Sequence, residues 1–165
     1  MKIRTKHLVL EPATLADVPA LYAFLGDPTA MRHTHHCRTL RDCRRHVAGH
    51  EWQRRRIGCA PWSIRRHDDR ALIGWGGLFE DPFEPGWGVE LGYWFAPHAW
   101  GQGYASELAA ACVDHARDRL RLTQLRAFAK PENVASCRVL EKAGFERQHF
   151  VPELARHLYR HELGR

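Results

Sequence analysis

The sequence lacks any long apolar run. None of its 165 residues belong to a stretch near the ~20 apolar residues that span a bilayer, and residues 1–8 lack the apolar segment of a secretory signal peptide. The five cysteines include no Cys-x-x-Cys pair, and an odd number without that spacing favours free thiols in a reducing compartment. We therefore expect a cytoplasmic protein that does not contact a membrane.

Long runs of basic residues are also absent, although the chain is basic overall. The 25 Lys and Arg outnumber the 19 Asp and Glu, which gives a net charge of +6 at pH 7. The longest basic run is Arg54-Arg55-Arg56, and there is neither a zinc-finger spacing nor an RNP-like aromatic motif. The charge favours anionic partners such as phosphorylated cofactors, without indicating dedicated nucleic-acid binding.

The remaining composition is that of a folded domain, with 44% hydrophobic and 27% charged residues. We find no internal repeat, low-complexity tract or linker, so residues 1–165 are expected to form a single domain. Periodicity and capping signals predict helices over residues 14–25, from 39 onward, from the glycine turn at 101–103 to about 120, and over 133–143. Alternation predicts strands over residues 8–11, 62–66, 71–79, 89–95, 125–129, 145–151 and about 157–162. Because strands both precede and alternate with helices, a mixed α+β sheet is expected.

A glycine turn that joins a strand to a helix is the most informative feature. Gly101 and Gly103 follow the strand that ends at Phe95, and a helical pattern begins directly after them. Such a turn directs unpaired backbone N–H groups and the positive end of a helix dipole toward one point, where a phosphate can bind. A dinucleotide fingerprint would need a third glycine at Ser106, and the Gly-Lys-Ser/Thr of a P-loop is absent. A plain tight turn remains the alternative.

The residues around this turn carry a family resemblance. The chain reads Leu91-Gly92-Tyr93-Trp94-Phe95-Ala96-Pro97 and then Trp100-Gly101-Gln102-Gly103-Tyr104-Ala105. This sequence resembles the acetyl-CoA-binding motif of the GNAT superfamily of N-acetyltransferases, and most closely the ribosomal-protein N-terminal acetyltransferases. Further signatures are Leu8-Val9-Leu10, Asp27-Pro28, Ile73-Gly74, Asn133-Val134-Ala135-Ser136 and Leu140-Glu141-Lys142-Ala143-Gly144-Phe145. The chain departs from the family at Trp100, where Gln or Arg is usual, and at Glu11, where relatives often have Arg.

The resemblance implies a fold, a reaction and a cofactor site. The fold would be an α/β GNAT-like one, with a mostly antiparallel sheet of about six or seven strands, splayed at the cofactor site, and about four helices. The reaction would transfer acetyl from acetyl-CoA to a primary amine, on a protein N-terminus or a small molecule, directly in a ternary complex and without a metal. The expected CoA-binding residues are Phe95, Ala96, Trp100, Gly101, Gln102, Gly103, Tyr104, Ala105, Ser106 and Asn133.

Two residues are candidates for the chemistry. Alternation along the strand places Glu90 on the opposite sheet face from Leu91, and the resemblance implies that Glu90 acts as the base through water. The resemblance implies that Ser136 protonates or hydrogen-bonds the departing sulfur. Many relatives have a tyrosine near this helix as the general acid, but no tyrosine lies between Tyr104 and Tyr159, so Ser136 is the remaining candidate there. Alternatively, Glu90 is a solvated charge and Ser136 an ordinary residue of a helix first turn. Asn133 is also a plausible N-cap for that helix.

Other residues admit chemical hypotheses with simpler alternatives. His33, His35, His36 and Cys37, with His46 and His50 at i, i+4, could bind zinc, but they match no established spacing, so substrate contact or plain surface is favoured. Cys137 lacks the partners of an activated thiol and is interpreted as packing. The tryptophans at 52, 62 and 75 are expected in the core rather than in an acceptor pocket.

A CoA-binding regulatory protein without catalytic activity is the alternative function. The sequence does not identify the acceptor amine, and a homodimer is possible.

Overall fold

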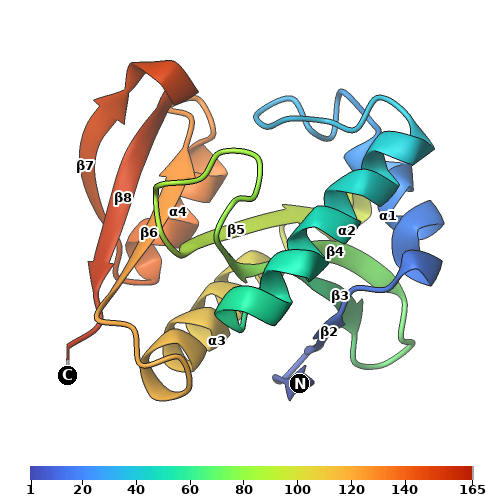
Figure 1. The fold of residues 1–165 in the computed structure, drawn as a ribbon, viewed down its shortest axis with the longest axis horizontal. Helices are drawn as coiled ribbons and strands as arrows, with labels where there is room; N and C mark the ends of the chain where they lie inside the picture. Colours follow the sequence, from blue (N-terminus) through green and yellow to red (C-terminus); the bar gives the residue numbers. More distant parts are fainter. Residues whose placement is uncertain (165) are drawn as a thin grey trace.

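The computed structural model describes residues 1–164, which form one open sheet with helices on both faces (Figure 1). The strands are β1 (Ile3–Arg4), β2 (Leu8–Pro12), β3 (Trp62–Arg66), β4 (Leu72–Phe79), β5 (Glu90–Phe95), β6 (Gln124–Ala129), β7 (Glu146–Val151) and β8 (Arg156–Glu162). The α-helices are α1 (Val18–Leu25), α2 (Leu40–Ile57), α3 (Tyr104–Asp118) and α4 (Val134–Lys142). The strand order is β1-β2-β3-β4-β5-β6-β8-β7. Every neighbouring pair is antiparallel except β5 with β6, so the mixed sheet predicted from the sequence is confirmed.

Two details differ from the sequence-based expectation. The sheet has eight strands rather than six or seven, because the two-residue β1 is too short to produce an alternating pattern. The first helix begins at Val18, and the three residues before it form a 3₁₀ turn. The Asp17 carboxylate accepts hydrogen bonds from the Thr14 backbone N–H (2.9 Å) and the Ser63 hydroxyl (3.0 Å), which holds this tighter turn against β3.

The sheet separates where its only parallel pair begins. β5 pairs with β6 only at Glu90 with Arg126 and at Leu91 with Ala127. The rest of β5 pairs with β4 alone. In Figure 1, β6, β7 and β8 stand together on one side of this opening, and β2 to β4 lie on the other. The second half of β5 therefore has no strand partner on its β6 side, and this unpaired edge lies between the two groups of strands.

Two hydrophobic clusters pack on opposite faces of the sheet. Leu91 and Phe95 belong to the cluster under α3 and α4, whereas Trp94 packs against the cluster under α1 and α2. Trp62 and Trp75 are buried as expected, but Trp52 on α2 is 57% exposed. The β5 side chains thus alternate between two helical layers, as the sequence predicted.

Glu11, where the chain departs from the family pattern, forms an ion-pair cluster at the sheet edge. Its carboxylate contacts Lys2 Nζ at 2.6 Å, Arg70 Nη2 at 2.9 Å and Arg65 Nε at 3.4 Å. The hydrogen bond from Lys2 and the neighbouring Arg70 lower the Glu11 pKa to about 2. A carboxylate is therefore stable where relatives often have a cation. Among residues 1–164, no helix is long and apolar enough to cross a membrane.

Candidate active site

The glycine turn has the conformation that its composition predicts. Gly101 and Gly103 have φ values of +72° and +82°, in the left-handed region where a Cβ causes strain. A Cβ at either position would meet no atom within 4 Å, so the turn borders open space. Gly103 is the N-cap of α3, and the first-turn N–H groups of this helix have no intrahelical partners. The turn therefore offers backbone donors to an anion.

A cleft of about 330 Å³ lies against this turn, in the splay of the sheet. Of the expected CoA-binding residues, its lining includes Phe95, Trp100, Gly101, Gly103, Tyr104, Ala105, Ser106 and Asn133. Ala96 and Gln102 are not in the lining. Ala96 is 4% exposed and packs in the cluster under α1 and α2, and the Gln102 side chain donates to the His98 carbonyl at 3.0 Å.

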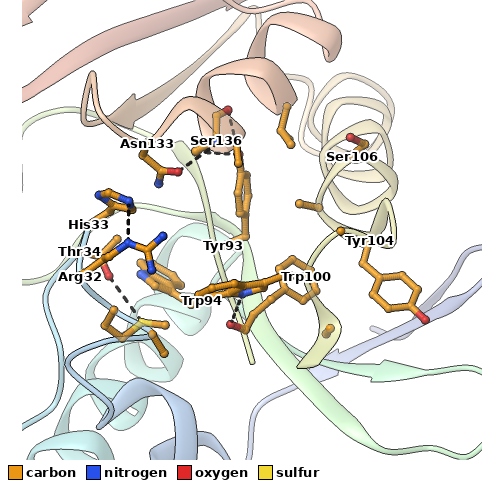
Figure 2. A pocket seen from close by; sticks show the side chains of 18 of the residues that line it. Arg32, His33, Thr34, Tyr93, Trp94, Trp100, Tyr104, Ser106, Asn133 and Ser136 are labelled. Carbon is orange, nitrogen blue, oxygen red and sulfur yellow. Dashed lines mark hydrogen bonds between the residues drawn. The ribbon is translucent and has the colours of Figure 1, made fainter. Parts of the chain in front are cut away.

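Arg32 is a cleft residue that the sequence reasoning missed. It comes from the loop between α1 and α2, and its guanidinium lies 5.8 Å from the centre of the Trp100 ring. The Trp100 indole N–H donates to the Phe95 carbonyl at 2.9 Å, which fixes the ring beside the glycine turn (Figure 2). Arg32 adds a positive charge to a cleft that already offers backbone donors. Only its position in the fold reveals this, because the family signature in this loop, Asp27-Pro28, does not include Arg32.

Tyr93 and Ser136 meet inside the cleft. The Tyr93 hydroxyl lies 3.0 Å from Ser136 Oγ, and the Ser136 backbone N–H donates to Asn133 Oδ1 at 3.3 Å (Figure 2). Asn133 is thus the N-cap of α4 as well as a cleft residue. Burial raises the pKa of Tyr93 to about 12, so its hydroxyl stays protonated at neutral pH. The sequence reasoning searched for a tyrosine only in the segment after Tyr104 and therefore missed Tyr93.

Glu90 lines a smaller cavity of about 90 Å³ that adjoins the cleft. The residues shared by both are His33, Thr34, Tyr93, Trp94, Asn133 and Ser136. Burial and the nearby negative charge of Asp81 raise the pKa of Glu90 to about 8, although the Arg156 guanidinium opposes this shift. Glu90 therefore holds its proton near neutral pH and loses it at slightly alkaline pH. The two predicted catalytic residues line one continuous space.

A third cavity, of about 620 Å³, lies beneath α2. It shares Thr34, Trp94 and Arg156 with the Glu90 cavity. His46 and His50 line it, and burial lowers their pKa values to about 4 and about 3, so both are neutral at pH 7. Of the four residues of the predicted His/Cys segment, His33 lines the cleft, whereas His35 and Cys37 line the third cavity and His36 lines none of the three. In residues 1–164, no group of three or more His, Cys, Asp or Glu side chains is arranged to hold a metal ion.

Cys137 is half-buried beside the cleft. Its thiol lies 3.7 Å from the Lys130 carbonyl, its one side-chain hydrogen bond among the described residues. Among residues 1–164, no hydrogen bond joins this thiol to a histidine or a carboxylate that would activate it. This geometry agrees with the interpretation of Cys137 as a packing residue.

Comparison with known proteins identifies the family. The acetyltransferase (GNAT) domain model matches residues 7–146. An uncharacterized N-acetyltransferase of Bacillus subtilis, YnaD, is 27% identical over 151 residues, which cover 91% of this chain and 85% of YnaD. The crystal structure of an acetyltransferase from Agrobacterium tumefaciens has a TM-score of 0.85 and 26% identity, covering 98% of this chain and 94% of that one. The ribosomal L7/L12 α-N-protein acetyltransferase RimL, solved with coenzyme A, has a TM-score of 0.82 at 20% identity and covers 98% of each chain. Together with the splayed mixed sheet, these matches show that the chain belongs to the GNAT family of N-acetyltransferases and is an acyltransferase.

Proposed function

We propose that the chain transfers an acetyl group from acetyl-CoA directly to a primary amine in a ternary complex, within a single domain formed by residues 1–165. The amine nitrogen attacks the thioester carbonyl carbon, the C–N bond forms and the C–S bond breaks. The leaving sulfur takes the electron pair and then a proton. The amine must be neutral to attack, and its excess proton must go to a base.

The cleft at the glycine turn is the proposed site for CoA. Open space in front of Gly101 and Gly103, free N–H groups at the start of α3 and the Arg32 charge all suit a pyrophosphate. RimL, which has the same fold, was solved with coenzyme A. The remaining expected CoA-binding residues, Ala96 and Gln102, would act by shaping the turn from behind.

Glu90 is the proposed base. Its carboxyl has a pKa of about 8, which is well matched to removing a proton from an amine near neutral pH. Glu90 lies in the cavity next to the cleft rather than in the cleft itself. A bound water in this cavity would carry the proton from the amine to the carboxylate.

Tyr93 and Ser136 are the proposed partners of the leaving sulfur. A tyrosine with a pKa of about 12 is a weaker acid than a thiol with a pKa near ~8.5, so complete proton transfer from Tyr93 is unfavourable. The hydroxyl pair is instead suited to donate a hydrogen bond to the sulfur as negative charge develops. Solvent then supplies the proton.

One observation carries this proposal. Tyr93 and Ser136 line both the cleft and the Glu90 cavity, so the base and the hydroxyl pair face a single reaction space from two sides. A protein that only bound CoA would have no requirement for a carboxyl of raised pKa at this place. The arrangement therefore favours catalysis over a purely regulatory role.

The test is a thiol-release assay. Purified protein is mixed with acetyl-CoA and a panel of primary amines that includes peptide N-termini, amino acids, polyamines and aminoglycosides. Amine-dependent release of free CoA, with the acetylated amine seen by mass spectrometry, is the expected result. Tight acetyl-CoA binding without transfer to any amine would instead indicate a catalytically silent CoA-binding protein.

A further inference from the structure

We propose that the cavity beneath α2 binds an amino-acid-like acceptor, in which the reactive primary amine stands next to a carboxylate and the side chain is aromatic. This inference rests on the proposed acetyl transfer and specifies its acceptor. It follows from three features of the cavity: its connection to Glu90, its aromatic walls and its unpaired charges.

The cavity beneath α2 shares walls with the proposed reaction space. Thr34 and Trp94 line the cleft, the Glu90 cavity and the cavity beneath α2, so all three spaces converge at these two residues. A molecule in the cavity beneath α2 can therefore extend an amine toward Glu90 while its body stays under α2. The volume of about 620 Å³ leaves ample room for a single amino acid with a large side chain.

The inner walls of the cavity are aromatic and uncharged. Trp75 and Trp94 stack with ring centres 5.2 Å apart, and His46 stacks on Phe83 at 5.2 Å. The His50 ring meets Trp75 edge-on at 5.1 Å, and both residues are only 1% exposed. Because burial keeps both histidines neutral, this wall carries no charge at pH 7. The ring surface open to a ligand belongs to the half-buried His46 and Trp94 and to Phe83, which is 47% exposed, and it favours a planar apolar side chain over an aliphatic chain of ammonium groups.

Arg156 supplies a cation at the junction with Glu90. It lines both the Glu90 cavity and the cavity beneath α2, and it lies near enough to lower the pKa of Glu90. Arg156 is half-buried, and among residues 1–164 its guanidinium forms neither an ion pair nor a side-chain hydrogen bond. A guanidinium without a protein partner is available to bind a carboxylate in a bidentate manner. An acceptor whose amine lies near Glu90 would thus have the neighbouring carboxylate within reach of Arg156.

With Arg156 included, the charged groups that line the cavity balance one another. Its lining contains three guanidinium and three carboxylate groups, on Arg38, Arg45, Arg156, Asp42, Asp81 and Glu84. None of these six groups takes part in the ion pairs found among residues 1–164. Arg38, Arg45 and Glu84 are exposed, whereas Arg156, Asp42 and Asp81 are half-buried, so charges of both signs are partly shielded from solvent around this cavity and suit a zwitterion. A polyamine or an aminoglycoside would place additional cations against Arg156, at a cost in binding.

Calorimetry with CoA present tests the ligand class without requiring turnover. The probes are L-phenylalanine, its decarboxylated analogue phenethylamine, and spermidine. We expect phenylalanine to bind more tightly than either amine, and Arg156→Gln to weaken phenylalanine binding by roughly tenfold or more while changing phenethylamine binding less than about twofold. Arg156→Lys should recover part of the loss. The matched control is Arg160→Gln, which lies on the same strand and outside the three cavities.

The outcomes separate this inference from the proposed function. Phenylalanine binding that is no tighter than phenethylamine binding, or that is unchanged in Arg156→Gln, would overturn the inference. If spermidine or an aminoglycoside is acetylated and phenylalanine is not, acetyl transfer stands and this acceptor class is wrong. If phenylalanine binds through Arg156 but no amine releases CoA, the ligand class stands and the proposed function fails.

Discussion

The Tyr93 hydroxyl and the Ser136 hydroxyl lie 3.0 Å apart, although the residues are separated by 43 positions in the chain. Tyr93 belongs to β5 and Ser136 to α4, so the contact bridges the opening where β5 leaves β6. A short contact between two hydroxyls at the edge of a cleft restrains both side chains.

Removing either hydroxyl is expected to slow turnover more than it weakens acetyl-CoA binding. Tyr93→Phe and Ser136→Ala each delete a hydrogen-bond donor from the leaving-group side, so kcat should fall by roughly tenfold to a hundredfold. Because the two hydroxyls act through one shared contact, the double variant should lose much less than the product of the single losses. Steady-state kinetics on the three variants measures this.

Tyr22→Phe is the matched control for Tyr93, because its hydroxyl makes one exposed hydrogen bond to the Arg38 carbonyl, outside the cleft. Ser136→Ala should change the free energy of unfolding by no more than about 0.5 kcal/mol. A pure rise in KM for acetyl-CoA would reassign Ser136 to cofactor binding. Unchanged kinetics in both single variants would show that solvent alone stabilises and protonates the leaving sulfur.

Glu90→Gln keeps the shape of the side chain and removes the proton acceptor. We expect turnover at pH 7 to fall by ~10²-fold with little change in acetyl-CoA affinity. In the wild type, activity should rise with pH through the Glu90 pKa of about 8, because only the ionised carboxylate is a base. The variant should lack this rise, so its deficit should grow up to about pH 8 and shrink only at higher pH, where the amine loses its own proton. Glu146→Gln, an exposed change on β7, is the control.

The same pKa shift predicts a dependence of stability on pH. The Glu90 pKa rises from 4.5 to about 8 on folding, so the folded state binds this proton more tightly than the unfolded state does. Below pH 4.5 both states are protonated and Glu90 has no effect. Between pH 4.5 and 8 the unfolded state ionises first, so the Glu90 contribution destabilises the fold increasingly as pH rises. Urea unfolding should show that Glu90→Gln gains stability relative to the wild type across this range; an equal pH dependence in both proteins would contradict the shift.

The sequence predicted the elements that local signals define. Thr39 and Asn133 cap α2 and α4 as expected, because an N-cap needs only a side-chain oxygen within a few residues of its partner N–H. Period-two alternation likewise placed Glu90 on the face opposite Leu91. The order β6-β8-β7 was not predictable in this way, because β8 pairs with strands on both sides of it through contacts distant in the chain.

For the candidate site, the sequence likewise indicated only what a local signal marks. The glycine turn was recognisable because positive φ values select glycine, and these positions carry a family motif. Tyr93 and Arg156 were missed, since their importance depends on what the fold brings beside them. Tyr93 becomes informative only next to Ser136, and Arg156 only next to Glu90.

Asp17 is predicted to be a centre of stability where the turn before α1 meets β3. Its buried carboxylate accepts from Thr14 and Ser63 and pairs with Arg65. Asp17→Ala leaves the Ser63 hydroxyl, which is 1% exposed, without its partner, and should lower the free energy of unfolding by about 2–4 kcal/mol. We expect a loss of unfolding free energy near the lower end of this range, because Arg65 keeps its ion pair with Glu11. Chemical denaturation checks this.

The control for that change is Asp68→Ala, whose side chain is 95% exposed. It should alter the free energy of unfolding by no more than about 0.5 kcal/mol. An equal loss in both variants would show that the Asp17 hydrogen bonds contribute nothing beyond a surface carboxylate.

Gly103→Val tests the glycine turn as the CoA site. Valine is strained at φ +82° and would project its methyl groups into the open space in front of the turn, where the pyrophosphate is expected. Acetyl-CoA affinity, measured by calorimetry, should therefore fall at least ~10-fold. Gly86→Val is the control that separates backbone strain from loss of the phosphate site. Gly86 also has a positive φ (+105°) and open surroundings. It lies on the loop between β4 and β5, outside the three cavities. If both variants fold and lose acetyl-CoA affinity equally, the effect is general strain and the turn is not the phosphate site. Loss in Gly103→Val alone, with a thermal midpoint matching that of Gly86→Val, assigns the pyrophosphate to the backbone of this turn.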